Sequence, residues 1–167
     1  MEAKPREPDT IHTKGRKIAV LGFAETVKDA PINDPSWELW GMNGFHRVAK
    51  ADFGFDVPES RWSFWFDMHS LEYHKHYGVL AKIPGQQEEW LSKSHPFPIF
   101  MLDTHAGFPS VLKFPIEEII EGFGRDYFTS TIAYMLAYAF AQEGVAEIGL
   151  WGVDLVHGTE WGDQRPC

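Results

Sequence analysis

Five short apolar stretches, each ending near a glycine or a polar residue, are spaced along the chain between segments long enough to form helices. The clearest is Lys17–Phe23, which opens on a base, continues with apolar residues and closes near a glycine. Continuous apolar runs of this length are typical of strands buried on both faces of a parallel sheet. The same pattern predicts strands at Glu38–Asn43, Trp62–His69, Ile99–Asp103 and Glu147–Asp154.

Residues between these strands show the features of helices. The strongest prediction is Thr129–Glu143, where apolar residues recur at helical spacing and Gly144 follows as a stop signal. Two further helices are predicted at Gln86–Ser94 and at Pro115–Gly122, the second with proline in its first turn. Asp103–Lys113, which contains glycine, proline and serine, is predicted to be a surface loop near the ligand edge.

Strands that alternate with helix-length segments predict the α/β class, as a Rossmann-like open parallel sheet of about five strands with helices on both faces. A chain of 167 residues fits one domain. We expect residues 1–16 to form a flexible leader and residues 17–167 a single Rossmann-like nucleotide-binding domain. Trp161–Cys167 reads as the start of a further segment, so we expect a domain shortened at its C-terminus or completed by a second copy in a homo-oligomer.

Composition and charge exclude several classes of protein. A hydrophobic content of 44% supports a full core and excludes a disordered or fibrous chain. A net charge of -9 makes the chain a poor binder of nucleic acids or anionic membranes. No apolar run approaches the roughly 18 residues of a membrane span, and the N-terminus lacks the apolar stretch of a signal peptide. Cys167 is the one cysteine, so no intrachain disulfide can form, and we expect a cytoplasmic protein.

Polar and ionisable side chains follow the predicted strands. The carboxyl ends of parallel strands meet at one edge of the sheet, where ligands bind in open α/β folds. A polar turn residue is a sufficient explanation for any single strand end, but the recurrence of Asn, Asp and His predicts a binding site. The residues concerned are Gly22, Thr26, Asn43, Asp67, His69, Asp103, His105, Asp154 and His157.

Three hydroxyl residues, Thr129, Ser130 and Thr131, stand at the start of the strongest predicted helix. Unpaired N–H groups and the helix dipole allow such a start to hold a phosphate. The simpler interpretation is that Thr129 or Ser130 only caps the helix. His69, at a strand end, is the candidate to donate to a phosphate or to transfer a proton.

Two standard cofactor sites and a metal site are disfavoured. Gly22–Thr26 has a single glycine, so it is neither a dinucleotide fingerprint nor a Walker A loop. Asp67 and His69 are the residues that a metal would use, but the spacing matches no standard zinc pattern. His74 and His76 belong to a segment that we predict to be solvent-exposed surface. We therefore predict no metal site.

Asp154 and Trp161 each have two interpretations. Asp154 could bind a ribose hydroxyl, a metal or a neighbouring backbone group, or it could cap the next turn. Trp161 could stack on a base, as could Tyr134, although aromatic residues in such places more often serve packing.

Four motifs, in this order, resemble those of the bacterial sialyltransferases that use CMP-sialic acid. The chain is similar as well to relatives of unknown function, including pterin pyrophosphokinase-like proteins and small phage-encoded proteins. The resemblance implies a Rossmann-like fold and a nucleotide or nucleotide-sugar ligand, with no further cofactor required. The motifs are Val20–Asp29, Leu39–Asn43, Tyr127–Met135 and Glu147–Asp154.

The resemblance also implies roles for particular residues. Asn43 matches an asparagine that contacts the nucleotide, and Thr129 and Ser130 match a Thr-Ser pair that contacts donor and acceptor. The phosphate loop of the family is typically Gly-Asn-Gly-Pro-Ser. The matching stretch here is Gly22–Thr26, which keeps the first glycine and a final hydroxyl but carries Glu25, whose charge repels a phosphate.

The catalytic groups of the family match less well. His157 and Trp161 fall near tyrosines that assist the phosphate leaving group in the family. Its general-base histidine lies beyond the position equivalent to Arg165, so the base would come from elsewhere, such as His69. These residues predict a nucleotide-binding, glycosyltransferase-like protein and leave its enzymatic activity open. The alternatives are a non-catalytic phage-type module that binds or sequesters a nucleotide-derived signal, and a structural or assembly protein.

Overall fold

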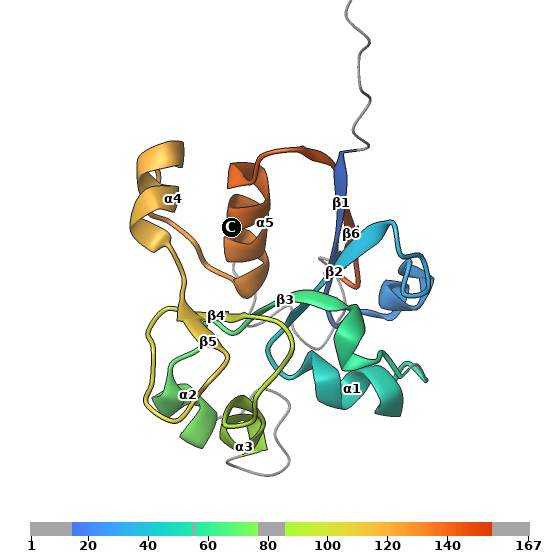
Figure 1. Ribbon diagram of the computed structural model, residues 1–167, viewed down its shortest axis with the longest axis horizontal. Coiled ribbons are helices and arrows are strands. Elements are labelled where there is room, and N and C mark those ends of the chain that lie inside the picture. Colours follow the sequence, from blue (N-terminus) through green and yellow to red (C-terminus); the bar gives the residue numbers. More distant parts are fainter. Residues whose placement is uncertain (1–14, 55, 77–85, 155–167) are drawn as a thin grey trace, which may run out of the picture.

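The computed structural model describes residues 15–54, 56–76 and 86–154. All strand pairs are parallel, and the six strands form one sheet in the order β5-β4-β3-β2-β1-β6 (Figure 1). The strands are β1 (Arg16–Leu21), β2 (Trp37–Met42), β3 (Trp62–Phe66), β4 (Ile99–Met101), β5 (Val111–Lys113) and β6 (Val145–Trp151). The helices are α1 (Phe45–Ala51), α2 (Leu71–His76), α3 (Gln86–Leu91), α4 (Ile116–Phe123) and α5 (Thr131–Ala141), with 3-10 turns η1 (Glu25–Asp29) and η2 (Glu59–Arg61).

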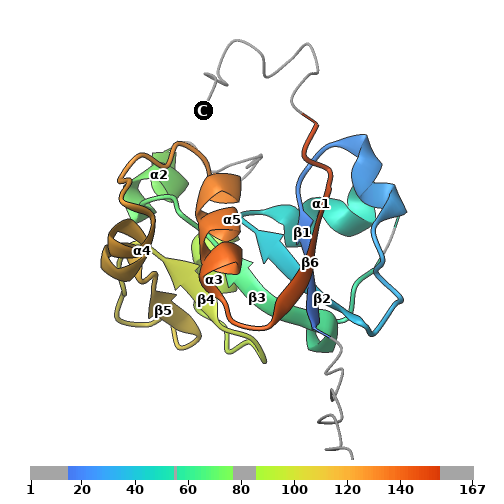
Figure 2. The same ribbon diagram turned by 90° about the horizontal axis from the view of Figure 1, so that it is seen from above.

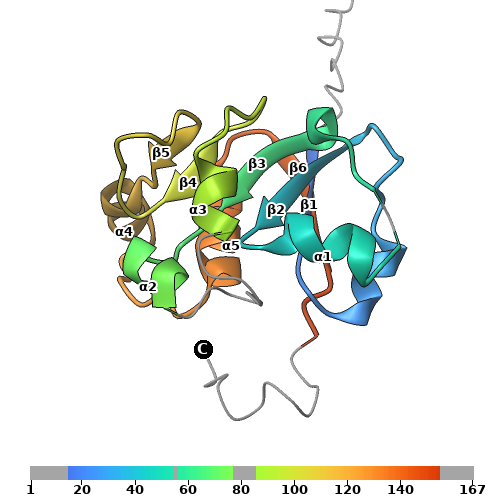
Figure 3. The same ribbon diagram turned by 90° about the horizontal axis from the view of Figure 1, so that it is seen from below.

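The strand order explains why helices cover both faces of the sheet. From β1 to β5 the chain moves steadily in one direction, and it then returns across the sheet to place β6 beside β1. Because parallel crossovers are right-handed, reversing the direction of travel moves the connecting helices to the opposite face. Figure 2 shows α4 and α5 over one face, and Figure 3 shows α1, α2 and α3 over the other.

Two apolar clusters hold these layers together. Alternate residues of β1 enter different clusters, with Ala19 and Leu21 on the α1 face and Ile18 and Val20 on the α5 face. The first cluster includes Phe45 from α1 and Leu91 from α3, whereas the second includes residues of α4 and α5. Burial on both faces is the reason why the central strands are almost continuously apolar in sequence.

The predicted fold class is confirmed, and the sheet has one strand more than predicted. The additional strand is β5, which occupies the end of Asp103–Lys113, so the prediction of a loop is wrong for its last three residues. Val111 pairs with Ile99 of β4. A three-residue edge strand with Leu112 half exposed is too short to give a periodic signal.

The helix boundaries differ from prediction by a few residues. The helix predicted at Thr129–Glu143 is α5, which begins at Thr131 and ends at Ala141. Gln142 is its C-cap, and Gly144, two residues later, adopts a left-handed φ of 71°. Helices α1 and α2 were not predicted, because each is at most seven residues long, which is too short to give a clear periodic signal.

Predictions about the termini fall largely outside the described residues. Of the predicted leader, residues 15 and 16 are described, and Arg16 is already the first residue of β1. The predicted shortening at the C-terminus concerns residues 155–167, which are not described. Among the helices of the described ranges, none has the length and hydrophobicity needed to cross a membrane.

Candidate functional site

The turn after β2 places Asn43 at the carboxyl edge of the sheet. Its φ of 45° makes it the one non-glycine residue with a left-handed backbone within the described ranges, a conformation that asparagine tolerates well. The Asn43 N–H donates to the Phe66 carbonyl at 2.8 Å. Thr131 Oγ1, at the start of α5, donates to Asn43 Oδ1 at 3.3 Å. Two of the predicted site residues, 88 positions apart in sequence, therefore meet at this edge.

A buried carboxylate lies beside Asn43. Asp67 follows β3 directly and is fully buried. Gln87 of α3 joins the two residues, because its Nε2 donates to Asp67 Oδ2 at 2.8 Å and to the Asn43 carbonyl at 3.2 Å. On the other side of the carboxylate, His74 Nε2 lies 3.0 Å from Asp67 Oδ1. A connected polar network thus runs from α5 through β2 and α3 to β3 and α2.

The charge of Asp67 is maintained by its neighbours. Burial by itself raises the pKa of this carboxyl, but the adjacent imidazoles of His69 and His74 outweigh burial and hold the pKa below its usual range. An ionised carboxylate can only accept hydrogen bonds, so His74 must donate through Nε2–H. The network therefore contains a buried negative charge that faces two imidazoles.

His69 is the member of this group that reaches solvent. Its side chain is 27% exposed, whereas those of Asp67 and His74 are almost completely buried. Its Nδ1 lies 3.4 Å from Asp67 Oδ1, and its backbone N–H donates to the same oxygen at 3.3 Å. The ring stacks on Tyr73 with centroids 4.4 Å apart and planes 18° apart. A carboxylate and an aromatic ring therefore fix the orientation of this imidazole, as the predicted role in proton transfer requires.

Helix α1 contributes a cation and a third histidine. The Arg47 guanidinium lies over Gly44, since a Cβ on Gly44 would clash with its terminal nitrogen. Burial lowers the pKa of Arg47, and the charge of Asp67 only partly offsets this effect. Burial, followed by the charge of Arg47, lowers the pKa of His46 to about 3, so His46 is neutral. Positive charge at this edge therefore comes from Arg47, beside Asn43.

The ends of β1 and β6 are closed against each other. A Cβ on Gly22 would collide with the carbonyl of Gly152, so Gly22 serves a close backbone contact within the fold. Thr26 Oγ1 donates to Asp154 Oδ1 at 2.7 Å and accepts from the Gly152 N–H at 3.0 Å. Three residues predicted to bind ligand, Gly22, Thr26 and Asp154, thus contact this part of the protein itself, and their role in binding stays a prediction.

The start of α5 combines a cap with exposed hydroxyls. Ser130 is the N-cap, and its Oγ accepts from the Ala133 N–H at 3.3 Å, as the simpler interpretation of this residue predicts. Thr129 and Ser130 are exposed, whereas Thr131 is buried against Asn43. Capping accounts for one donor of the first turn, so it is compatible with an anion at the same helix end.

The sequence analysis missed three residues of this site. The prediction that His74 lies on solvated surface is wrong, because α2 turns it inward to Asp67. Gln87 was not considered, although its spacing from Leu91 places both on the core-facing side of α3. Arg47 gave no signal, because the sequence does not show that α1 begins immediately after the end of β2.

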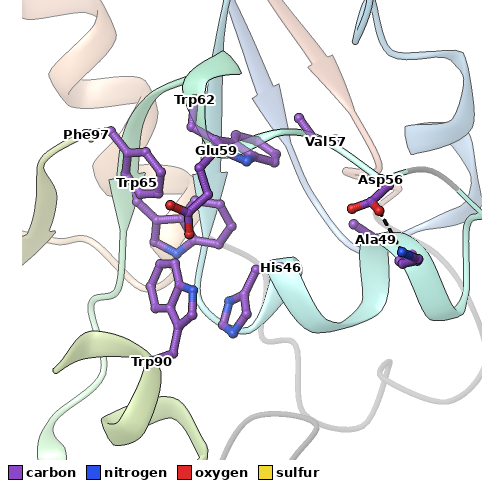
Figure 4. A pocket seen from close by; sticks show the side chains of 10 residues that line it. His46, Ala49, Asp56, Val57, Glu59, Trp62, Trp65, Trp90 and Phe97 are labelled. Carbon is purple, nitrogen blue, oxygen red and sulfur yellow. Dashed lines mark hydrogen bonds and ion pairs between the residues drawn. The ribbon is translucent and has the colours of Figure 1, made fainter. Parts of the chain in front are cut away.

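None of the predicted site residues lines either of two hollows in the described part of the chain. One, of about 220 Å³, is drawn in Figure 4, where Trp62, Trp65 and Trp90 face Asp56 across the opening. The other, of about 370 Å³, lies between the end of α5 and β6. Trp65 connects the first hollow to the network, because its indole N–H donates to the Asn43 carbonyl at 3.1 Å.

Of the other predicted residues, Asp103 is exposed after β4 and the His105 ring contacts Phe108. His157 and Trp161 lie outside the described residues. Comparison with protein-family models, curated proteins and solved structures gave no match to this chain. The resemblance to sialyltransferases therefore stays a prediction, and the function has to be argued from the site.

Proposed function

We propose that this protein binds a nucleotide or a nucleotide-linked sugar at the carboxyl edge of β2 and β3, in the manner of a glycosyltransferase. The observation that carries the proposal is the connected network of Thr131, Asn43, Gln87 and Asp67. Buried polar side chains are costly unless they are satisfied or serve a function. Here they converge at the carboxyl edge of a parallel sheet, the edge at which ligands bind in open α/β folds.

An anionic ligand needs local positive charge, because the chain carries a net charge of -9. Two features supply it at this edge. The start of α5 offers backbone N–H groups and the positive end of an eleven-residue helix dipole. Arg47 adds a guanidinium beside Gly44, with the planar donor geometry that suits phosphate.

Binding without turnover is the second candidate, and the first loop favours it. Thr26 is engaged by Asp154 and Gly152, and Glu25 pairs with Lys28 at 2.8 Å. A loop with these internal contacts differs from a phosphate cradle. A module that binds or sequesters a nucleotide-derived signal needs only the β2–β3 edge and the start of α5.

The test is a thermal-shift screen of the full chain with CMP, UMP, AMP and nucleotide sugars. We expect at least one of these to raise the melting temperature. Arg47→Gln should weaken the binding of that ligand by about 10-fold or more, because a charge-assisted hydrogen bond contributes roughly 1.5–3 kcal/mol. Lys50→Gln is the matched control, since it removes the same charge from an exposed position of the same helix.

The outcomes separate the alternatives. A ligand that binds and is recovered unchanged from a broad panel of acceptors supports the sequestering module. Transfer of its sugar supports the glycosyltransferase. Absence of any shift, or equal weakening by Arg47→Gln and Lys50→Gln, refutes binding at this edge.

A further inference from the structure

The carboxylate and the two imidazoles at the end of β3 form a compact set of potential metal ligands. One ligand atom from each of Asp67, His69 and His74 lies within 4.8 Å of the other two. We infer that these three side chains bind one divalent transition-metal ion. This inference is independent of the nucleotide proposed above.

Two of the three distances within the set suit a common ion. Adjacent ligands held about 2.1 Å from a metal are about 3.0 Å apart in octahedral and about 3.4 Å apart in tetrahedral geometry. His74 Nε2 is 3.0 Å and His69 Nδ1 is 3.4 Å from Asp67 Oδ1. An ion could therefore enter with small side-chain movements, replacing the proton between His74 and Asp67.

The surroundings prepare the set for a metal. Gln87 Nε2 donates to Asp67 Oδ2 and leaves Oδ1 directed at the imidazoles, as outer partners of metal-bound carboxylates do. His69 Nδ1 is a buried atom whose contact to Asp67 Oδ1, at 3.4 Å, is too long for a strong hydrogen bond. A metal ion would give this nitrogen a closer partner.

The ligand types and their burial indicate which metal. Two imidazoles and one carboxylate favour Zn²⁺, Mn²⁺, Fe²⁺ or Co²⁺ over Mg²⁺ and Ca²⁺, which prefer oxygen ligands. Asp67 and His74 are almost completely buried and His69 is 27% exposed, so solvent reaches the set from one side. Three protein ligands with an open side are the arrangement of reactive metal sites, as opposed to closed structural ones.

The experiment is metal titration of the chelator-treated full chain without nucleotide. Zn²⁺ and Mn²⁺ binding would be followed by calorimetry, and Co²⁺ binding by visible absorption, which reports nitrogen and oxygen ligation directly. We expect one ion per chain. His69→Ala should weaken binding by at least about 10-fold, the loss found even for outer-shell partners. Because His69 is partly exposed, this variant should stay folded.

His105→Ala is the matched control, because His105 is also partly exposed and lies outside the set. Loss of the ion in His69→Ala and Asp67→Asn, with retention in His105→Ala, supports the site. Absence of binding by all three metals, or an ion held equally by wild type and His69→Ala, overturns it. Since no nucleotide is present, failure here leaves the nucleotide proposal intact.

Discussion

The carboxyl edge of the sheet is built in two different ways along its length. At β1 and β6 the chain closes on itself, with Gly22 and Gly152 in backbone contact and Thr26 bonded to Asp154. At β2 and β3 the edge is made of side chains, with Asn43 and Asp67 joined through α3. The first region is closed by a backbone contact between two glycines and one side-chain hydrogen bond, whereas the second is filled with polar side chains.

This difference shows that the strand order alone does not determine where the polar site lies along the carboxyl edge. In the order β5-β4-β3-β2-β1-β6, the chain reverses its direction across the sheet, so β1 and β6 are neighbours whose connections run on opposite faces. Ligands commonly bind at such a point in open α/β sheets. Here that position is occupied by internal contacts. The ionisable side chains lie farther along the edge, at β2 and β3, where α5 also begins.

The largest loss of stability should come from a substitution that forces the ends of β1 and β6 apart. Gly152 has a φ of 72°, and a Cβ there would lie 2.6 Å from the Gly22 carbonyl oxygen. We expect Gly152→Ala to cost roughly 2–5 kcal/mol, from the left-handed backbone together with overpacking, measured by urea denaturation. Gly124→Ala is the control, because Gly124 has a similar φ of 64° but open space around it, and should cost only about 1–2 kcal/mol. Equal losses would show that the two strand ends are not in close contact.

The β2–β3 region should respond to loss of a single donor. Gln87→Leu leaves the Asn43 carbonyl and Asp67 Oδ2 without the amide that joins them. We expect a loss of about 1–3 kcal/mol of unfolding free energy, the usual cost of an unpaired buried polar group, because Asp67 Oδ2 loses this donor whereas the Asn43 carbonyl keeps the Trp65 indole N–H. Gln86→Leu, an exposed neighbour on the same helix, should change stability by about 0.5 kcal/mol or less. An unchanged free energy of unfolding in Gln87→Leu would contradict the network.

Low pH should also lower the free energy of unfolding, through His46 beside the β2–β3 region. The pKa of His46 is lowered to about 3 in the folded protein, against about 6.5 in an unfolded chain. Protonation therefore favours the unfolded chain, so this contribution to stability is complete above pH 6.5 and declines as the pH falls toward 3. Between pH 6.5 and pH 5 the loss should be about 2 kcal/mol, at about 1.4 kcal/mol per pH unit.

His46→Phe tests this assignment, because phenylalanine keeps a ring against Trp90, on which His46 stacks at 4.1 Å. Urea denaturation of this variant should lose most of the pH dependence in that window. An unchanged slope would assign the acid sensitivity to other groups.

The sequence predicted the strand ends better than it predicted their partners. Asn43 and Asp67 could be found because each directly follows an apolar run, and this local pattern survives in the fold. The contacts of Gln87 and Arg47 could not be found, since these contacts depend on how α3 and α1 dock against the sheet. The contact between Thr26 and Asp154 spans 128 positions and has no local signal.

The smallest effect concerns the start of α5, where a structural and a functional role coincide in Ser130. Ser130→Ala removes the hydroxyl that caps the Ala133 N–H and should cost about 1 kcal/mol. Ser130→Asp keeps a capping oxygen, so urea denaturation should show near wild-type stability. Its negative charge should nevertheless repel a phosphate and abolish the thermal shift caused by any nucleotide that binds. Ser60→Asp, exposed in η2, adds the same charge elsewhere and should leave the shift unchanged. If Ser130→Asp is stable and still binds, the phosphate does not lie at this helix end, and Arg47 becomes the main anchor.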